Sequence, residues 1–287
     1  MTPLLLNPQW LCGFVDGCGS FHIKKRLIGK KIDYQPEFSI THHRSGVQLL
    51  SAIRTLLGTG TVSPQSANNW QYCVRELPLL KSYIIPFFEA YPLLTNKRYE
   101  YEEWRYAVLE LFQAQKFNEQ QSHSWEGLAA ENNEEKWQLH QQSNLIFSQK
   151  PTLPTPWVVG FCDAQSEFSV NISSFSQIIF GYTTNVEFSI RQNYFASCIL
   201  DELQTFFGCG EVYNDTLNPT RSKLRIRSNP AITSIIVPFF EKNNFQTDKK
   251  FDFLRFRKVM HMINKREHMK VEGIQKILQI WPSAKEC

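Results

Sequence analysis

The residues best suited to bind a ligand are basic and lie close together in the sequence. Five positive charges fall within eight residues of the first half: Lys24, Lys25, Arg26, Lys30 and Lys31. The second half carries positive charge at alternate positions, Arg221, Lys223, Arg225 and Arg227, and again along residues 249–258. Such clusters are typical of phosphate binding and predict a polyanionic ligand, with a solvated hairpin tip as the alternative for the first cluster. The net charge of +4 is too small to decide between these interpretations.

Strands are the elements that must present these residues. Phe21 and Ile23 alternate with His22, Lys24 and Arg26, which gives one apolar and one polar face. Similar patterns predict strands over the ranges 21–26, 38–42, 71–75, 168–172, 188–192 and 223–227.

Helices are expected between and after the strand pairs. Amphipathic patterns at residues 47–57 and 196–207 each end at a glycine, which suits a helix C-terminus. A further helix opens each half of the chain, with Pro8 or Pro156 near its first turn. With closing helices that carry a Pro-Phe-Phe-Glu block, the order αββαββα occurs twice, which is an α+β fold.

The chain is internally duplicated. Residues 11–16 recur at 158–163, 37–40 at 187–190, 58–62 at 208–212, 86–89 at 238–241 and 95–100 at 247–252. The blocks keep their order at an offset of about 150 residues, which indicates two copies of one structural unit. We place the first repeat at 1–115, a helical tail and polar linker at 116–152, and the second repeat at 153–287.

Composition sets few further limits. The chain has 287 residues, of which 42% are hydrophobic and 20% charged, a balance typical of a folded globular protein. Seven cysteines without a C-x-x-C pair indicate free thiols rather than a disulfide framework or a zinc site. No apolar run approaches the length needed to span a bilayer, so we expect no membrane partner.

Two segments resemble the signature helix of the LAGLIDADG homing endonucleases and intron maturases. They are WLCGFVDGCGSF at residues 10–21 and WVVGFCDAQSEF at residues 157–168. The resemblance covers nearly the whole chain, and two signatures at this separation are more specific than one. Other patterns of that family are matched at Thr95 and Lys97, at Thr247 and Lys249, and at residues 266–274.

The resemblance implies a particular arrangement of the two repeats. They would pack through their signature helices, and their concave antiparallel sheets would form a saddle that binds nucleic acid. Small residues four apart would let the two helix backbones approach closely: Gly13, Gly17, Gly160 and Ala164. A chain duplicated in this way is expected to act as a monomer.

In that family the eighth signature position carries an acidic residue that holds Mg²⁺ at the scissile phosphates. Here the position is Cys18 in the first repeat and Gln165 in the second, and neither side chain supplies a hard anionic oxygen. We therefore expect no intact catalytic residue and no metal cofactor. Asp16 and Asp163 are expected to have structural roles, and Glu167 to lie along the following strand.

The resemblance also indicates which residues contact nucleic acid. Lys97 and Lys249 match a basic residue near the active site of the family, and His42 and Gln192 match a polar position close to it. The predicted contacts on the two sheets are His22, Lys24, Lys25, Arg26, Lys30, Lys31, His42, Arg75, Gln192, Arg221, Lys223, Arg225 and Arg227. The second hairpin, at residues 171–180, is uncharged and suits a protein contact or base stacking better than phosphate binding.

Four functional hypotheses remain open. The favoured one is a catalytically inactive relative of the homing endonucleases that binds structured RNA. It would act as an intron splicing factor (maturase) or as a component of an organellar ribonucleoprotein such as the mitochondrial ribosome, with protein partners at the second hairpin. The alternative is a DNA-binding endonuclease with residual or nicking activity; an inactivated DNA-binding scaffold and a pure protein-interaction role are the others. The resemblance implies an organelle, a mitochondrion rather than a chloroplast.

Overall fold

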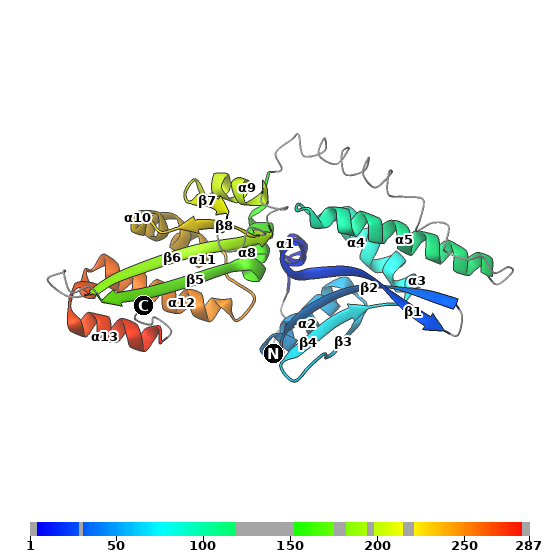
Figure 1. Cartoon of the computed structure of the whole chain (residues 1–287), viewed down its shortest axis with the longest axis horizontal. Helices are drawn as coiled ribbons and strands as arrows, with labels where there is room; N and C mark the ends of the chain where they lie inside the picture. The colour runs from blue at the N-terminus through cyan, green and yellow to red at the C-terminus, as the bar shows by residue number, and fades with distance from the viewer. Residues whose placement is uncertain are drawn as a thin grey trace. The chain divides into compact units, whose positions relative to one another are not determined.

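The computed structural model describes residues 5–28, 31–118, 152–174, 182–193, 198–214 and 221–282. The chain divides into two compact units, residues 1–154 and 155–287, each with one four-stranded sheet (Figure 1). None of the helices in the described ranges has the length and apolar content needed to cross a membrane. The two units repeat one order of elements, as the duplicated sequence blocks predict.

The first unit opens with helix α1 (Pro8–Cys18), whose first turn is capped by the Asn7 side chain, which accepts the N–H of Gln9 at 2.8 Å. The following elements are β1 (Gly19–Ile28), β2 (Lys31–His43), η1 (Arg44–Gly46), α2 (Val47–Leu57), β3 (Thr61–Pro64), β4 (Asn69–Val74), α3 (Leu77–Leu79), η2 (Leu80–Ile84), α4 (Ile85–Ala90) and α5 (Lys97–Asn118). The strands pair antiparallel in the order β1-β2-β4-β3.

The second unit repeats this architecture, with sheet order β5-β6-β8-β7. Its elements are α8 (Thr155–Gln165), β5 (Ser166–Ser174), β6 (Tyr182–Asn193), α9 (Cys198–Phe207), β7 (Glu211–Asn214), β8 (Arg221–Ile226), α10 (Asn229–Ala231), η4 (Ile232–Ile236), α11 (Val237–Lys242), α12 (Lys249–Asn264), η5 (Glu267–Met269) and α13 (Val271–Ile280).

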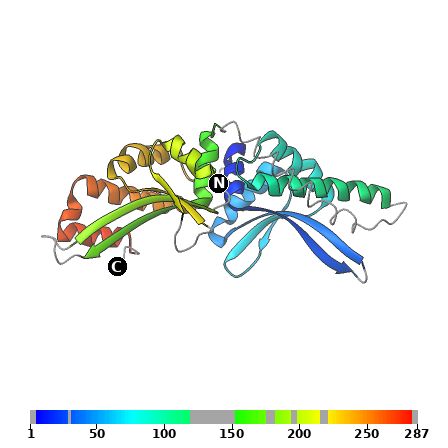
Figure 2. The same cartoon turned by 45° about the horizontal axis from the view of Figure 1, so that its top comes forward.

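Helices cover one face of the sheet in each unit (Figure 2). Phe21 of β1 stacks on Phe38 of β2 at 5.0 Å between ring centroids, and rings from α4 and α5 surround the pair. Phe168 has the same surroundings in the second unit, and burying each such ring stabilises the fold by about 1.5–3 kcal/mol. We call the opposite face of each sheet the polar face. It carries Lys24, Glu37 and Ser39 in the first unit and Glu187, Ser189 and Lys223 in the second.

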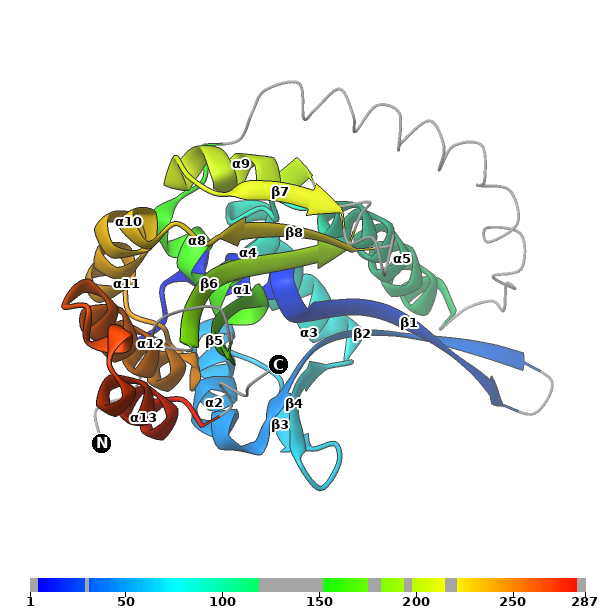
Figure 3. The ribbon, with the colours of Figure 1, turned by 60° about the vertical axis from the view of Figure 1, so that its left-hand side comes forward.

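The predicted elements are largely observed, with longer strands than expected. Helix α2 spans the predicted range, and Gly58 follows it with a left-handed φ of 70°. Strands β1 and β2 continue to Ile28 and Lys31 as one long ribbon (Figure 3). Helix α5 extends to Asn118, three residues into the predicted segment 116–152, and the helical tail stays a prediction beyond that point. Residues 119–151 of the predicted linker and 194–197 before α9 lie outside the described residues.

A π-helical segment precedes each Pro-Phe-Phe-Glu block, and no sequence pattern predicted it. Pro86 lies in a continuous helical run, where its ring would clash with the carbonyl four residues earlier. The wider turns of η2 and η4, before Pro86 and Pro238 respectively, move that carbonyl away from the ring.

Gly273 allows helix α13 to approach the turn η5, because a Cβ there would lie 1.8 Å from the carbonyl oxygen of Glu267. Gly273→Ala should lower the free energy of unfolding by about 3 kcal/mol, since backbone atoms must move. Gly208→Ala is the matched control: nothing lies within 4 Å of its Cβ, so only the strain of φ +64° remains, about 1 kcal/mol. Chemical denaturation of both variants measures the difference, and equal losses would contradict the packing argument.

Candidate nucleic-acid interface

A buried aspartate ties the signature helix of the first unit to the loop before α5. Asp16 is 1% exposed and accepts three hydrogen bonds. The donors are the N–H of Leu94 at 2.8 Å, the N–H of Thr95 at 3.2 Å and the hydroxyl of Thr95 at 2.6 Å. The carboxylate is therefore engaged within the fold, which is a structural role of the kind that the sequence predicts.

The second unit repeats this connection with the same geometry. Asp163 is 4% exposed and accepts from the N–H of Gln246 at 2.8 Å. It also accepts from the N–H and the hydroxyl of Thr247, at 3.2 Å and 2.6 Å. The threonine of each Thr-x-Lys pattern thus binds the sixth residue of the signature.

The lysines of those patterns bind at the same junction. The ammonium of Lys97 donates to the carbonyl oxygen of Gly19 at 2.5 Å, and that of Lys249 donates to the carbonyl oxygen of Ser166. Burial lowers the pKa of Lys249, an effect that the nearby Asp163 carboxylate partly opposes. Each ammonium lies at the first residue after a signature helix, and a phosphate contact there stays a prediction.

The signature helices end in Cys18 and Gln165, which are both partly exposed. The thiol of Cys18 donates to the carbonyl oxygen of Phe14 at 3.2 Å. Mg²⁺ prefers hard, largely anionic oxygen ligands, so a thiol and a neutral amide do not fit it. The adjacent carboxylates of Asp16 and Asp163 are already engaged by their three donors. Across the described ranges, no group of three or more His, Cys, Asp or Glu side chains could hold a metal ion.

Glu167 is the one acid that follows a signature helix closely in the sequence. It is the second residue of β5, pairs in register with Ser189, and forms an ion pair with Arg191 at 2.6 Å. It lies along the strand, where the sequence places it, and is paired there.

The polar face of the first sheet has a carboxylate at its centre. Glu37 on β2 is 4% exposed and accepts from Lys24 Nζ and Arg75 Nε, each at 2.6 Å. Burial by itself would raise the pKa of Glu37, but the hydrogen bonds from Lys24 and Arg75 outweigh it and hold the pKa below its ordinary value. The ionised carboxylate therefore holds two cations in place on this face.

The polar face of the second sheet has the same feature. Glu187 on β6 accepts from Lys223 Nζ and from Arg227 Nε, the latter at 2.6 Å, and Arg225 Nε lies 3.9 Å away. Burial would raise its pKa, and Lys223 and Arg227 reverse that shift and lower it. The guanidinium of Arg225 also stacks over the Tyr213 ring at 4.5 Å from the centroid.

Sequence reasoning missed both glutamates as parts of the site. The repeated block Glu-Phe-Ser-Ile holds the signal, because its phenylalanine and isoleucine face the core and its glutamate must face the polar side. An acid on a face that is predicted to bind a polyanion indicates a partner for neighbouring cations. Five predicted contacts share their charge in this way: Lys24, Arg75, Lys223, Arg225 and Arg227.

The other predicted contacts are distributed unevenly. Exposed positions on the polar faces are held by His22, Arg26 and Arg221. Lys25 belongs to the alternate set of side chains, with its ammonium 5.6 Å from the centroid of the Tyr34 ring. Lys30 lies outside the described residues, and only the backbone of Lys31 is described.

His42 and Gln192 lie on the helix-covered faces, near the ends of their strands, and a nucleic-acid contact by either stays a prediction. Side chains alternate along β2, so His42 shares the side of the buried Phe38, and its ring centroid lies 6.1 Å from that of Phe14 in α1. Gln192 follows the buried Phe188 by the same alternation on β6. The sequence identified polar residues at the strand ends and did not resolve which face they occupy.

The small residues predicted at the helix interface all lie within the signature helices α1 and α8, four residues apart in each. Gly13 and Gly160 are buried, and Gly17 and Ala164 are half-buried. Packing of the two units through these residues stays a prediction.

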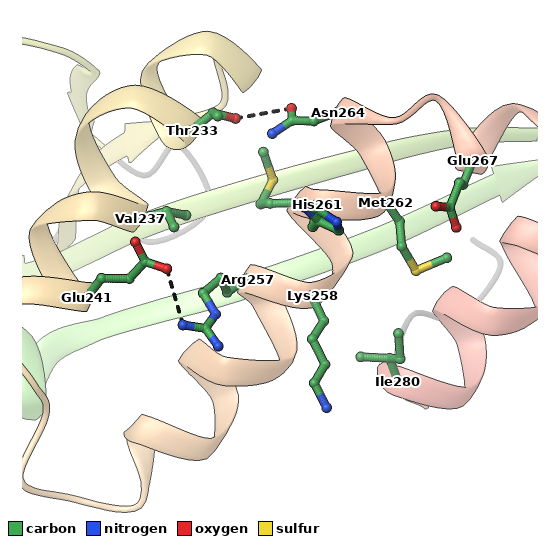
Figure 4. Close-up of a pocket in the computed structure, with 11 residues that line it drawn as sticks. Thr233, Val237, Glu241, Arg257, Lys258, His261, Met262, Asn264, Glu267 and Ile280 are labelled. Atoms are coloured by element: carbon green, nitrogen blue, oxygen red, sulfur yellow. Dashed lines mark hydrogen bonds and ion pairs between the residues drawn. The ribbon is translucent and has the colours of Figure 1, made fainter.

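One cavity, of about 620 Å³, lies among the helices of the second unit rather than on a sheet (Figure 4). Arg257 of α12 donates to Glu241 of α11 at 3.1 Å, and the Thr233 hydroxyl donates to Asn264 at 3.2 Å. These four polar groups of the cavity bind each other rather than pointing free donors or acceptors at a ligand. The polar faces of the sheets, which carry more exposed cations, are therefore the better candidate site.

Comparison with known proteins points to one family. Probable intron-encoded endonuclease 3 of Neurospora crassa is 27% identical over 96% of this chain and 54% of its own length. Probable intron-encoded endonuclease Cox1-I1b of Schizosaccharomyces pombe is 30% identical over 79% of this chain and 54% of its own length. The chain thus spans about half the length of these curated relatives.

Solved structures show the same fold. I-SmaMI bound to an uncleaved DNA target in the presence of calcium ions has a TM-score of 0.81 at 22% identity, covering 98% of this chain and 100% of that one. The LAGLIDADG meganuclease I-CpaMI bound to uncleaved DNA has a TM-score of 0.80 at 25% identity, with the same coverage. A family model described as LAGLIDADG endonuclease matches residues 11–108 and 158–260, so this chain belongs to the LAGLIDADG endonuclease family.

Proposed function

We propose that this chain binds duplex DNA through the polar faces of its two sheets, with a metal-dependent cleavage activity that is residual at most. The observation that carries the proposal is the set of cations that Glu37 and Glu187 hold on those faces. Fixed cations bind a polyanion with less loss of side-chain entropy than mobile ones. The solved relatives named above are DNA complexes, which supports duplex DNA as the ligand.

Loss of cleavage is proposed from the ends of the signature helices. A thiol at Cys18 and an amide at Gln165 remove the anionic oxygens that a two-metal displacement requires. The nearest carboxylates, Asp16 and Asp163, hold the loops before α5 and α12 and are not spare ligands. The chain keeps the binding faces while the residues for metal chemistry have changed.

RNA is the ligand that the sequence favours, and the comparisons support duplex DNA better. We therefore propose DNA and treat RNA as one outcome of the test. A mitochondrial location is proposed with it. The relatives are named as intron-encoded proteins of fungi, and one of Saccharomyces cerevisiae, 23% identical over 57% of this chain, is named as a mitochondrial protein.

Selection from random libraries tests the ligand class. The full chain is incubated at physiological salt with randomised duplex DNA and with RNA transcripts of the same length, and the retained molecules are sequenced. We expect related duplex sequences to be enriched and to compete off the RNA. Enrichment of a structured RNA without any preferred duplex would contradict the proposal and support the maturase hypothesis.

The salt dependence of duplex binding should locate the phosphate contacts on the first hairpin. Replacing Lys24, Lys25, Arg26 and Lys31 by Ser should reduce the slope of log K against log salt by about two to four units. The matched control replaces four exposed cations that lie outside the predicted clusters: Arg54, Lys242, Lys265 and Lys276. It removes the same charge and should leave the slope within about one unit of the original. Similar slopes in the two variants would show that net charge, rather than the hairpin, drives binding.

A further inference from the structure

Arg75 and Arg227 occupy equivalent places in the two units. Arg75 directly follows β4 and Arg227 directly follows β8, the strands that pair with β2 and β6 respectively. Each arginine donates Nε to Oε2 of a buried glutamate at 2.6 Å. The second cation on each glutamate differs in origin. Lys24 comes from β1, on one side of the strand β2 that carries Glu37. Lys223 comes from β8, on the opposite side of the equivalent strand β6 that carries Glu187. The arginine–glutamate pair is thus the part of the arrangement that both copies share.

The geometry of these pairs leaves the end of each guanidinium available. Within the described residues, Arg75 and Arg227 bond to protein only through Nε, so Nη1 and Nη2 still carry donors. Their side chains are 44% and 61% exposed, while the partner carboxylates are 4% and 9% exposed. A buried carboxylate at Nε restricts the orientation of the guanidinium, and the exposed remainder of each side chain leaves its Nη donors accessible to a ligand.

We propose that Arg75 and Arg227 each read a guanine in the major groove, with Nη1 and Nη2 donating to O6 and N7, and that Glu37 and Glu187 are positioning residues for this contact. The inference rests on the proposed DNA binding and names residues that determine specificity within it. Guanine is the base that offers two adjacent acceptors on its major-groove edge, and a planar pair of donors fits them.

A base contact fits these pairs better than a phosphate contact. Each glutamate binds more cations than it can neutralise, so each polar face stays positive, but the arginine whose Nε is bonded to the carboxylate has the weaker attraction for a phosphate. Hydrogen bonding to the neutral edge of a base depends on geometry, and the carboxylate improves the geometry. Lysine at the same place would keep the charge and lose the paired donors.

Binding-site selection with variants of the full chain tests the assignment. We expect the preferred duplex to contain one guanine whose selection is lost in Arg75→Lys and a different guanine whose selection is lost in Arg227→Lys. Discrimination against adenine at that position should fall by about tenfold, with affinity for other positions and the salt slope unchanged. Glu37→Gln should relax the same position as Arg75→Lys, and Glu37→Asp should restore part of the preference.

The matched control is a second arginine–glutamate pair on the helical side of the first unit. Arg105 donates Nε and Nη2 to Glu89 at 3.0 Å and 2.7 Å, and its conversion to lysine should change no base preference. Thermal unfolding of each variant separates misfolding from lost specificity. A uniform loss of affinity in the uncharged variant Arg75→Gln, with a lower salt slope and unchanged base preferences, would show a phosphate contact and overturn the inference. Unchanged base preferences would overturn the inference alone, whereas absence of any duplex binding by the unsubstituted chain would overturn the proposed function as well.

Discussion

Restoring a carboxylate at the end of both signature helices should restore cleavage. In the double variant Cys18→Glu/Gln165→Glu, we expect the Mg²⁺-dependent rate of cutting the selected duplex to rise by roughly 10³-fold or more over the unsubstituted chain. The reason is that a hard divalent cation binds where anionic oxygens replace a thiol and an amide. Single-turnover cleavage of a labelled duplex, with and without Mg²⁺, measures the change.

Two controls make this prediction specific. Cys18→Gln changes the size of the first helix end without adding charge and should not raise the rate. Cys18→Glu alone supplies one carboxylate, so cutting should stay well below that of the double variant. An unsubstituted chain that cuts in Mg²⁺ as fast as the double variant would show that other residues supply the ligands.

The surroundings of the two substituted positions support this expectation. Lys97 and Lys249 still donate to the carbonyl groups of Gly19 and Ser166, the residues directly after the two changed positions. The same lysine-to-carbonyl hydrogen bond is therefore present at the helix end in both units. In the proposed function, the two altered side chains are therefore the only part of each junction that the double variant needs to replace.

Much of the fold could be predicted because the sequence is internally duplicated and each element is therefore seen in two copies. A weak helical or strand pattern in one repeat is supported by the same pattern about 150 residues later, so α2 at residues 47–57 was placed to the residue. The π-helical segment before Pro86 could not be predicted in this way. It depends on where the proline ring meets the helix backbone, which hydrophobic periodicity does not report.

The site was predicted less completely because the identity of a polar residue does not show on which face of the sheet its side chain lies. Alternation from Phe21 placed Lys24 on the polar face, whereas His42, near a strand end, was assigned by resemblance and lies against Phe14. The role of Glu37 depends on cations from two neighbouring strands, and their register follows from pairing rather than from local sequence.

Removing either signature aspartate should destabilise the chain more than any other single substitution considered above. Asp16→Ala leaves two backbone N–H groups and one hydroxyl without their acceptor, and Asp163→Ala does the same in the second unit. We expect each variant to lose about 3–5 kcal/mol of the free energy of unfolding, with a fall in Tm of about 10 °C. Calorimetry and chemical denaturation measure both quantities.

Two comparisons separate this effect from a general loss of negative charge. Asp33→Ala removes an exposed carboxylate from β2 and should change the free energy of unfolding by less than about 0.5 kcal/mol. Thr95→Val removes the hydroxyl, which donates to Asp16 and accepts from the N–H of Lys97, and keeps the two backbone N–H bonds to Asp16, so its cost should fall between the two. If Asp16→Ala unfolds like Asp33→Ala, the loop before α5 does not depend on the signature helix. The hydrogen bonds of Asp16 and Asp163 would then contribute little to the free energy of unfolding, and they could not be what holds each signature helix to the following loop.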